Sequence, residues 1–486
     1  MSDIPIILHE HFDSTTISED QCDCACSTTS LSTQPIKHSE DVPYVTTPDY
    51  FIFPLSTSFV VASAPQVKPV VLNMSTLTII DYFQKPHLRA EAYAQWGEMW
   101  GLALDNVLDQ LIELGLLEPV EHCLQPFQKE VESLSAWMHL TERCNLQCTY
   151  CYLSKTHNEM LLSTGHAVID SVFRSAQRQG YKHIKLKYAG GEPLLCFPKL
   201  VAIHNYAKAK ATKEGVTLEG IILSNGTLLT PEIAKTIHQL GLQLMISLDG
   251  LGQFHDRQRP RVGGGKSSIA VLDAIGLAYA VGLTPNISIT VSGQNVSGLP
   301  EMIKWVLKRD LPFSLNFYRE NECSRSHTEL ALEEEQIILG LRAAFEIIET
   351  YMPRRSLLAA LVDRANLAIP HQQPCAVGAT YLVFDSRGHV AKCPMQIKHI
   401  VASSDSADPL ALVQADQNGI QNLTVDSKEG CRECRWRYWC SGGCPLVTRQ
   451  HSGRYDVQSP NCRIYKSLFP DVVRLEGLRL LKWASC

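Results

Sequence analysis

Residues 144–152 read CNLQCTYCY and place Cys144, Cys148 and Cys151 in a C-x3-C-x2-C spacing. The string directly follows a β-like run at residues 136–140. In parallel α/β folds, active sites lie at the carboxyl ends of the strands. Three thiolates on one short loop can bind three irons of a [4Fe–4S] cube, whereas a closed electron-transfer cluster takes four. We therefore expect a cluster with one open iron at the end of the first strand.

Downstream of this strand, β-like runs alternate with helical patterns as far as about residue 325. The runs cover residues 136–140, 183–188, 220–224, 242–248, 285–291 and 313–317. The helical patterns cover residues 163–179, 197–214, 231–240, 268–281 and 299–308. Six β–α units predict an α/β fold with a parallel sheet, either an open doubly wound sheet or a partial (β/α)6 TIM-like barrel.

Composition narrows the class of protein. The chain has 486 residues, a formal net charge of −6 and 17 cysteines. Slight acidity gives no reason to expect nucleic acid as a partner, and the apolar runs fall short of the ~18 residues that span a membrane. The first twenty residues lack the basic region of a signal peptide. We expect a cytoplasmic protein whose thiols serve as metal ligands or catalytic groups more than as disulfides.

The chain divides into five predicted parts. They are a flexible N-terminal arm (1–45), a winged-helix-like module (46–130), the α/β core (131–325), a linker helix region (326–370) and a Cys-rich C-terminal domain (371–486). The arm holds Cys22, Cys24 and Cys26, to which we assign no role. The module is predicted from short β-like stretches and amphipathic helical patterns at residues 50–53, 59–62, 69–72, 75–83 and 102–114.

Motifs at the tips of the successive strands make the core similar to the radical S-adenosylmethionine (SAM) superfamily. The residues that carry the resemblance are Tyr150, Gly190, Gly191, Glu192 and Pro193 of AGGEP, Ser224 and Asn225 of SNGT, Ser247 and Asp249 of SLDG, and Arg259 of HDRQR. The resemblance implies that SAM chelates the open iron, that Tyr150 packs near its adenine, and that the AGGEP turn binds its amino group. It also implies that Ser247 and Arg259 contact the ribose or the carboxylate, which an arginine fork suits.

Seven further cysteines resemble the SPASM extension of radical SAM maturases. Gly388-x4-Cys393 precedes a C-x2-C-x5-C-x3-C run, and the full set is Cys375, Cys393, Cys431, Cys434, Cys440, Cys444 and Cys462. The resemblance implies two auxiliary [4Fe–4S] clusters, a nearer one on Cys375, Cys393 and Cys444 and a farther one on Cys431, Cys434, Cys440 and Cys462. A structural zinc knuckle within residues 431–444 is the alternative.

The nearer set has three cysteines. Some relatives place a fourth soon after the first, where this chain has Tyr381. Either a ligand other than cysteine completes the site, or one iron is open to substrate.

The module at residues 46–130 resembles the peptide-recognition elements that precede maturases of ribosomally made peptides. Such elements add a leader peptide as a strand to an exposed sheet edge; a purely structural cap is the alternative. The resemblance therefore predicts a maturase that cleaves SAM to a 5′-deoxyadenosyl radical and cross-links a precursor peptide or protein through a thioether, carbon–carbon or ether bond. The electron donor would be of the ferredoxin or flavodoxin type.

Other reactions remain open from sequence. They are formylglycine formation as in anaerobic sulfatase maturases, peptide splicing, small-molecule radical chemistry and a non-catalytic scaffold. Sulfatase maturases place a catalytic Asp two residues after the cysteine that corresponds to Cys393, whereas Met395 stands there in this chain. This departure argues against formylglycine formation.

Overall fold

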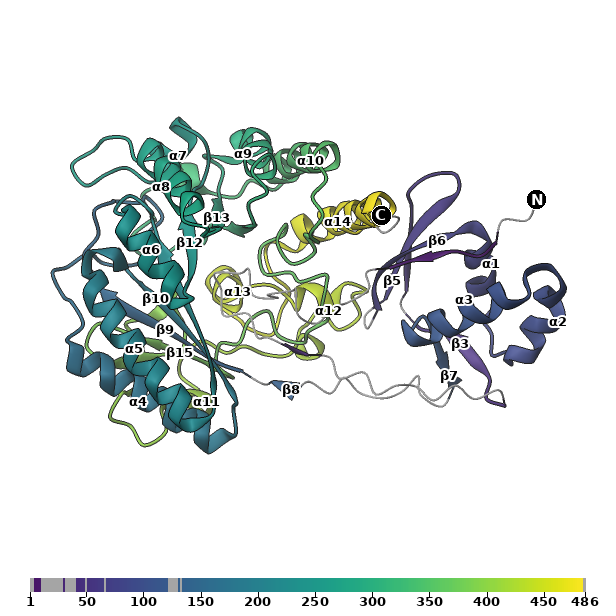
Figure 1. The fold of residues 1–486 in the computed structure, drawn as a ribbon, viewed down its shortest axis with the longest axis horizontal. Coiled ribbons are helices and arrows are strands. Elements are labelled where there is room, and N and C mark those ends of the chain that lie inside the picture. Colours follow the sequence, from purple (N-terminus) through teal and green to yellow (C-terminus); the bar gives the residue numbers. More distant parts are fainter. Residues whose placement is uncertain are drawn as a thin grey trace.

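The computed structural model describes residues 4–9, 29–30, 41–48, 50–64, 67–120, 130–131 and 133–483. The unassigned Cys22, Cys24 and Cys26 lie outside the described residues. A large α/β unit carries most of the chain, and a small N-terminal unit lies beside the last helix (Figure 1).

A nine-stranded sheet organises the large unit, with the order β14-β13-β12-β11-β10-β9-β15-β16-β17. Its first six strands in the chain run parallel and pair in sequence order. They are β9 (Ser133–Thr141), β10 (His183–Gly190), β11 (Thr217–Ser224), β12 (Gln243–Ser247), β13 (Asn286–Val291) and β14 (Phe313–Phe317). The prediction of an α/β fold with a parallel sheet is confirmed, and the described sheet is not a closed barrel, because β14 and β17 form its two separate edges.

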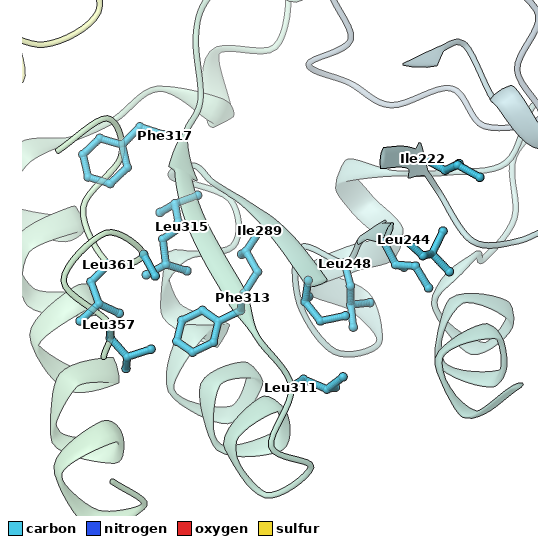
Figure 2. Packing of buried hydrophobic residues seen from close by; sticks show 14 of the residues in the cluster. Ile222, Leu244, Leu248, Ile289, Leu311, Phe313, Leu315, Phe317, Leu357 and Leu361 are labelled. Atoms are coloured by element: carbon cyan, nitrogen blue, oxygen red, sulfur yellow. The ribbon is translucent and has the colours of Figure 1, made fainter. Parts of the chain in front are cut away.

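The two faces of the strands differ in chemistry. In β9, Leu134, Ala136, Met138 and Leu140 pack into the main apolar core, and the alternating side chains face the other way. Figure 2 shows the same packing at the far end of the sheet, where apolar side chains of β12 to β14 gather with those of residues 357–361. The inner face carries polar side chains such as Ser135 and His139 beside a smaller apolar cluster that includes Trp137 and Val383, and this face carries the site.

Helices complete the β–α units: α4 (Leu162–Gln179), α5 (Phe197–Glu214), α6 (Pro231–Leu240), α7 (Gln253–Gln258), α8 (Ser268–Ala280), α9 (Leu299–Leu307) and α10 (Glu334–Thr350). Capping fixes their ends. Thr230 accepts a hydrogen bond from the backbone N–H of Ile233 at the start of α6, and Pro231 occupies its first turn. Gly241 ends α6 with φ of 70°, a left-handed conformation that suits glycine.

The C-terminal part continues the main sheet. β15 (Tyr381–Phe384) pairs parallel to β9, and β16 (His389–Ala391) and β17 (Ile400–Ser403) follow as antiparallel strands. Four helices come after them, α11 (Pro409–Ala415), α12 (Arg437–Cys440), α13 (Pro445–Ser452) and α14 (Cys462–Trp483). The Cys-rich region is therefore hydrogen-bonded to the strand that leads into the first cysteine triplet.

The N-terminal unit combines a small sheet with three helices. The sheet has the order β1-β6-β5-β4, built from β1 (Ile7–Leu8), β4 (Phe51–Pro54), β5 (Phe59–Ala64) and β6 (Val67–Asn73). The helices are α1 (Met74–Tyr82), α2 (Arg89–Trp100) and α3 (Leu102–Glu113), and the short pairs are β3 (Tyr44–Thr46) with β7 (Leu117–Pro119) and β2 (Thr29–Ser30) with β8 (Glu130–Val131). Strands β1 and β2 fall inside the segment predicted as an arm. The five-part division otherwise stays a prediction.

The last helix joins the two units. Gly477 of α14 fits against Leu55 and Val61, and the ring of Phe51 stacks on Trp436 with centroids 4.3 Å apart. None of the helices in the described ranges combines the length and hydrophobicity needed to cross a bilayer.

Candidate active site

The first cysteine triplet occupies the loop that leaves β9. The Cys144 thiol accepts a hydrogen bond from the backbone N–H of Leu146 at 3.4 Å. The side-chain amide nitrogen of Asn225 lies 3.9 Å from the Cys144 sulfur, and a guanidinium nitrogen of Arg259 lies 3.8 Å from the Cys148 sulfur. Burial raises the pKa of Cys148 to about 12. A bound metal is therefore what would hold this side chain as a thiolate.

The AGGEP turn after β10 lies directly against this loop. A Cβ on Gly190 would come 2.3 Å from the carbonyl oxygen of Thr141, and one on Gly191 would come 2.0 Å from that of Arg143. Gly190 also has φ of 134°, which side-chain-bearing residues rarely adopt. The N–H of Gly191 donates to Thr141 and that of Glu192 to Arg143, at 2.7 and 2.9 Å. Only glycines allow the two loops to approach this closely.

The Glu192 carboxylate is fully buried and joins the second motif to the third. It accepts hydrogen bonds from the Ser224 hydroxyl at 2.8 Å, the Asn225 N–H at 2.8 Å and the Leu194 N–H at 3.0 Å. Burial raises its pKa, while these donors oppose the change. The Glu192 side chain thus positions Asn225. Pro193 begins the short helical turn that directly follows Glu192 in the chain. Asn225 in turn donates to the side-chain oxygen of Asn145 at 2.9 Å, within the cysteine loop.

Asp249, buried after β12, holds the residues assigned to SAM in one group. Its carboxylate accepts from the Tyr150 hydroxyl at 2.6 Å and from Arg259 Nε at 2.7 Å, and Gln258 and the Thr290 N–H also donate to it. The Arg259 guanidinium lies 5.1 Å from the centroid of the Tyr150 ring. Burial opposes ionisation of Asp249, yet the charge of Arg259 keeps its pKa below the ordinary value. Ser247 ends β12, where it lies opposite Ser288 of β13.

The farther cysteine set converges on one small cavity. Cys431, Cys434, Cys440 and Cys462 all line it, although 31 positions separate the first from the last. Trp436, Tyr465 and Phe469 form apolar walls. Four thiols around one small space match the ligand set of a closed cluster as well as that of a tetrahedral zinc site.

The nearer set lines a larger cavity of about 190 Å³ that also reaches Tyr150. Cys375, Cys393 and Cys444 share its wall with aromatic and apolar side chains: Trp137, Tyr152, Phe317, Tyr318, Tyr381, Met395 and Leu446. The cavity therefore connects Tyr150, one of the residues assigned to SAM, with the three thiols.

Two arginines that sequence reasoning missed, Arg319 and Arg364, also line this cavity. Burial opposes ionisation of the Cys444 thiol, but the two guanidinium charges lower its pKa below the ordinary value. Arg319 is fixed by Asp363 at 2.7 Å, and Asp363 also accepts from the Tyr465 hydroxyl at 2.9 Å. No sequence motif marks these residues.

The cysteine sets supply thiols, which are the usual protein ligands of iron–sulfur clusters. Within the described ranges, no three His, Cys, Asp or Glu side chains converge closely enough to hold one metal ion. A cube holds its thiolates at separate corners and so needs a wider spacing. The cysteines that the structure describes are all free thiols.

Comparisons with known proteins bear on the α/β core. Residues 138–306 match the family model of the Radical SAM superfamily. Fe-coproporphyrin III synthase of Methanosarcina barkeri is 28% identical over 231 residues, which are 45% of this chain and 53% of the relative. The chain thus spans about half the length of that relative.

Two similarities cover more of the chain. A cysteine-type anaerobic sulfatase-maturating enzyme of Clostridium perfringens is 22% identical over 348 residues, 67% of this chain and 92% of the relative. The solved structure of native anSMEcpe with bound AdoMet and the Cp18Cys peptide superposes with a TM-score of 0.58 at 18% identity, over 73% of this chain and 99% of that one. The structural likeness shows a shared fold.

Proposed function

This chain carries a radical SAM domain, as its sequence predicts, and from this premise we propose that it is a SPASM-type maturase that cross-links a precursor peptide or protein. One observation carries the proposal: a single cavity extends from Tyr150 to Cys375, Cys393 and Cys444. A substrate side chain in this cavity would lie between the SAM residues and the nearer auxiliary cluster.

The proposed cofactors divide among the cysteine sets. Cys144, Cys148 and Cys151 would hold the SAM-binding [4Fe–4S] cluster, and the other seven cysteines would hold two auxiliary [4Fe–4S] clusters. When bound, the first cluster supplies the electron that cleaves SAM to methionine and a 5′-deoxyadenosyl radical, which takes a hydrogen atom from the substrate. A ferredoxin- or flavodoxin-type donor would supply electrons in the cytoplasm, where the thiols stay reduced.

The residues of this chain then have definable tasks. Asp249 fixes Tyr150 and Arg259 in one arrangement, so that an aromatic face and a guanidinium are presented together to SAM. Glu192 ties Ser224 and Asn225 to the turn that contacts the cysteine loop. The aromatic wall of the cavity excludes water from a carbon radical, which would otherwise be open to side reactions.

Peptide cross-linking is favoured over formylglycine formation by the cavity wall. Oxidation of a Ser or Cys side chain to an aldehyde requires removal of a proton from its oxygen or sulfur. Met395 lines the cavity where sulfatase maturases place their Asp, and a thioether cannot serve as the base. No Asp, Glu or His is among the described residues that line this cavity.

The N-terminal unit would bind the leader of the precursor. Its sheet has two edges among the described strands, β1 and β4. Strand β4 lies against α14 and Trp436, whereas β1 pairs with only Val71 and Leu72 of β6. A peptide strand would therefore add at the β1 edge of this sheet.

SAM cleavage tests the catalytic half of the proposal. The reconstituted, reduced protein should convert SAM to 5′-deoxyadenosine, and Cys144→Ala should lose this activity together with about four irons per chain. Retained cleavage in Cys144→Ala would refute the assignment of the first cluster.

A second experiment tests the substrate class. Each short open reading frame next to this one is co-expressed with the protein, and the peptide masses are measured. Loss of two hydrogens with a new inter-residue bond in tandem mass spectrometry is the expected result. A mass change that corresponds to oxidation of one Ser or Cys side chain to an aldehyde would favour formylglycine formation.

A further inference from the structure

Tyr381, the first residue of β15, carries a polar atom that the fold leaves unsatisfied. Its side chain is fully buried, and its hydroxyl has no hydrogen-bond partner among the described residues. Leaving a buried hydroxyl unpaired costs about 1–3 kcal/mol. Other buried tyrosine hydroxyls near the site are satisfied, since Tyr150 donates to Asp249 at 2.6 Å and Tyr465 to Asp363 at 2.9 Å.

The strand register places Tyr381 beside the nearer cysteine set. In the β15–β16 ladder, Val383 pairs with Ala391 and Phe384 with Val390. If this antiparallel register is extended by two residues along each strand, Tyr381 lies opposite Cys393, on the face shared by Val383 and Ala391. Tyr381 and Cys393 also belong to the same buried cluster of side chains.

A tight turn brings Cys375 to the same place. The N–H groups of Ala379 and Thr380 both donate to the carbonyl of Ala376, at 3.0 and 3.1 Å, so the chain turns back between Cys375 and Tyr381. Tyr381 then lines the same cavity as Cys375, Cys393 and Cys444. Three thiols and one unpartnered phenol therefore surround one space.

We propose that the Tyr381 phenolate is the fourth ligand of the cluster held by Cys375, Cys393 and Cys444. This inference rests on the proposed function, which supplies the cluster. A [4Fe–4S] cube offers four iron corners, and three cysteines fill three of them. Tyrosinate is an established ligand of protein-bound iron.

The ligation step balances without a change of oxidation state. One Fe–O bond forms and the phenol O–H proton leaves to solvent, as ligands must deprotonate when metal binds. Arg364, which lines the same cavity, offers a positive charge that favours the anionic oxygen. The nearer cluster is then closed, so a substrate thiolate does not bind its iron and the cluster only accepts or donates electrons.

Resonance Raman spectroscopy of the fully loaded protein tests this ligand. The wild-type chain should hold about twelve irons, four for each cluster, and show phenolate ring modes enhanced by excitation into an iron–phenolate charge-transfer band. Tyr381→Cys, which replaces oxygen with a thiolate, should keep the iron and lose these modes. Tyr381→Phe should lose them as well.

Tyr152→Phe is the matched control. Tyr152 lines the same cavity, but its hydroxyl lies 3.3 Å from His139 Nε2. The phenolate modes should persist in this variant. Their absence from the wild-type protein at full iron content, or their loss in Tyr152→Phe alone, would overturn the assignment of Tyr381.

Iron content separates this inference from the proposal beneath it. If the protein holds about four irons per chain and still cleaves SAM, both auxiliary clusters are ruled out, and the assignment of Tyr381 as a ligand is ruled out with them. About twelve irons without phenolate modes would overturn the Tyr381 ligand alone and leave the maturase proposal standing.

Discussion

At the scale of single residues, the site depends on two buried carboxylates that are directed at the protein and not at a ligand. Glu192 receives three donors from the chain, and Asp249 receives Tyr150 and Arg259. A buried charge is tolerated when it is paired and hydrogen-bonded. These carboxylates therefore arrange the side chains that contact SAM in the proposed function.

Asp249→Asn should separate positioning from ligand contact. The change leaves the buried Arg259 cation without its anion, which typically costs about 3–5 kcal/mol. We expect lower thermal stability and at least a roughly tenfold weaker SAM affinity, equivalent to about 1.4 kcal/mol. Equilibrium dialysis with labelled SAM on cluster-loaded protein measures the second effect.

Asp256→Asn is the control for this residue. Asp256 accepts from the N–H groups of Ser267 and Ser268 at 2.9 and 2.8 Å and so stabilises the start of α8. Its loss should cost about 1 kcal/mol of stability and leave the SAM affinity unchanged. Equal losses of SAM affinity in both variants would contradict the role given to Asp249.

At the scale of elements, helix α5 packs on the sheet through His204. Its Nδ1 lies 3.0 Å from the Tyr188 hydroxyl of β10, and the ring lies over Gly220 of β11. Burial lowers the pKa of His204 to about 4. The folded protein therefore holds a neutral imidazole where the unfolded chain, with a pKa near 6.5, takes up a proton.

This difference sets a pH dependence. Since the unfolded state binds more protons between pH 6.5 and 4, stability falls as the pH falls through that window. Between pH 7.5 and 5 the loss from His204 should be about 2 kcal/mol. Urea unfolding of the wild-type protein and of His204→Gln, which keeps an acceptor for Tyr188, should diverge by this amount. Parallel pH profiles would show that His204 titrates normally.

The elements also show what the sequence could predict. The bounds predicted for α5 and α6 agree with the structure, and each predicted core strand overlaps an observed one, because long segments of clear period are bounded by glycine and proline. Helix α2 was missed: it buries only Ala92 and Trp96, so its apolar pattern is weak.

Long-range contacts could not be predicted. The pairing of β15 with β9 cannot be predicted from the sequence, because partners 246 positions apart, such as Tyr381 and Ser135, leave no local signal. The same holds for Asp363, which accepts hydrogen bonds from the Phe317 N–H, 46 positions away, and from Arg319, 44 positions away. The cysteines of the candidate site could be recognised from their spacing. Arg319, Arg364 and the Tyr381 hydroxyl beside them could be identified only in the folded structure.

At the scale of the whole molecule, the N-terminal unit and the large unit meet where a glycine permits close contact. A Cβ on Gly477 of α14 would lie 2.8 Å from Leu55 Cδ1 and 2.8 Å from Val61 Cβ. The Val61 atom belongs to a buried strand and cannot move aside freely. Size at this position therefore controls how the units fit together.

Gly477→Ala should accordingly destabilise the protein by about 1–3 kcal/mol through overpacking. Gly276 on α8 offers a matched comparison, because a Cβ there meets nothing within 4 Å. Gly276→Ala should stabilise its helix by up to about 1 kcal/mol. Calorimetric melting measures the change in stability of each variant. Stabilisation of both variants would show that the interface at Gly477 has room for a larger side chain.

The ladder between β9 and β15 has a consequence for electron transfer in the proposed reaction. β9 ends at the loop of Cys144, and β15 begins at Tyr381, beside Cys375 and Cys393. Tunnelling rates fall exponentially with distance, so a hinge between the two redox sites would make transfer erratic. Here the spacer is a hydrogen-bonded strand pair within one sheet, which fixes the tunnelling distance while the rest of the molecule accommodates a substrate.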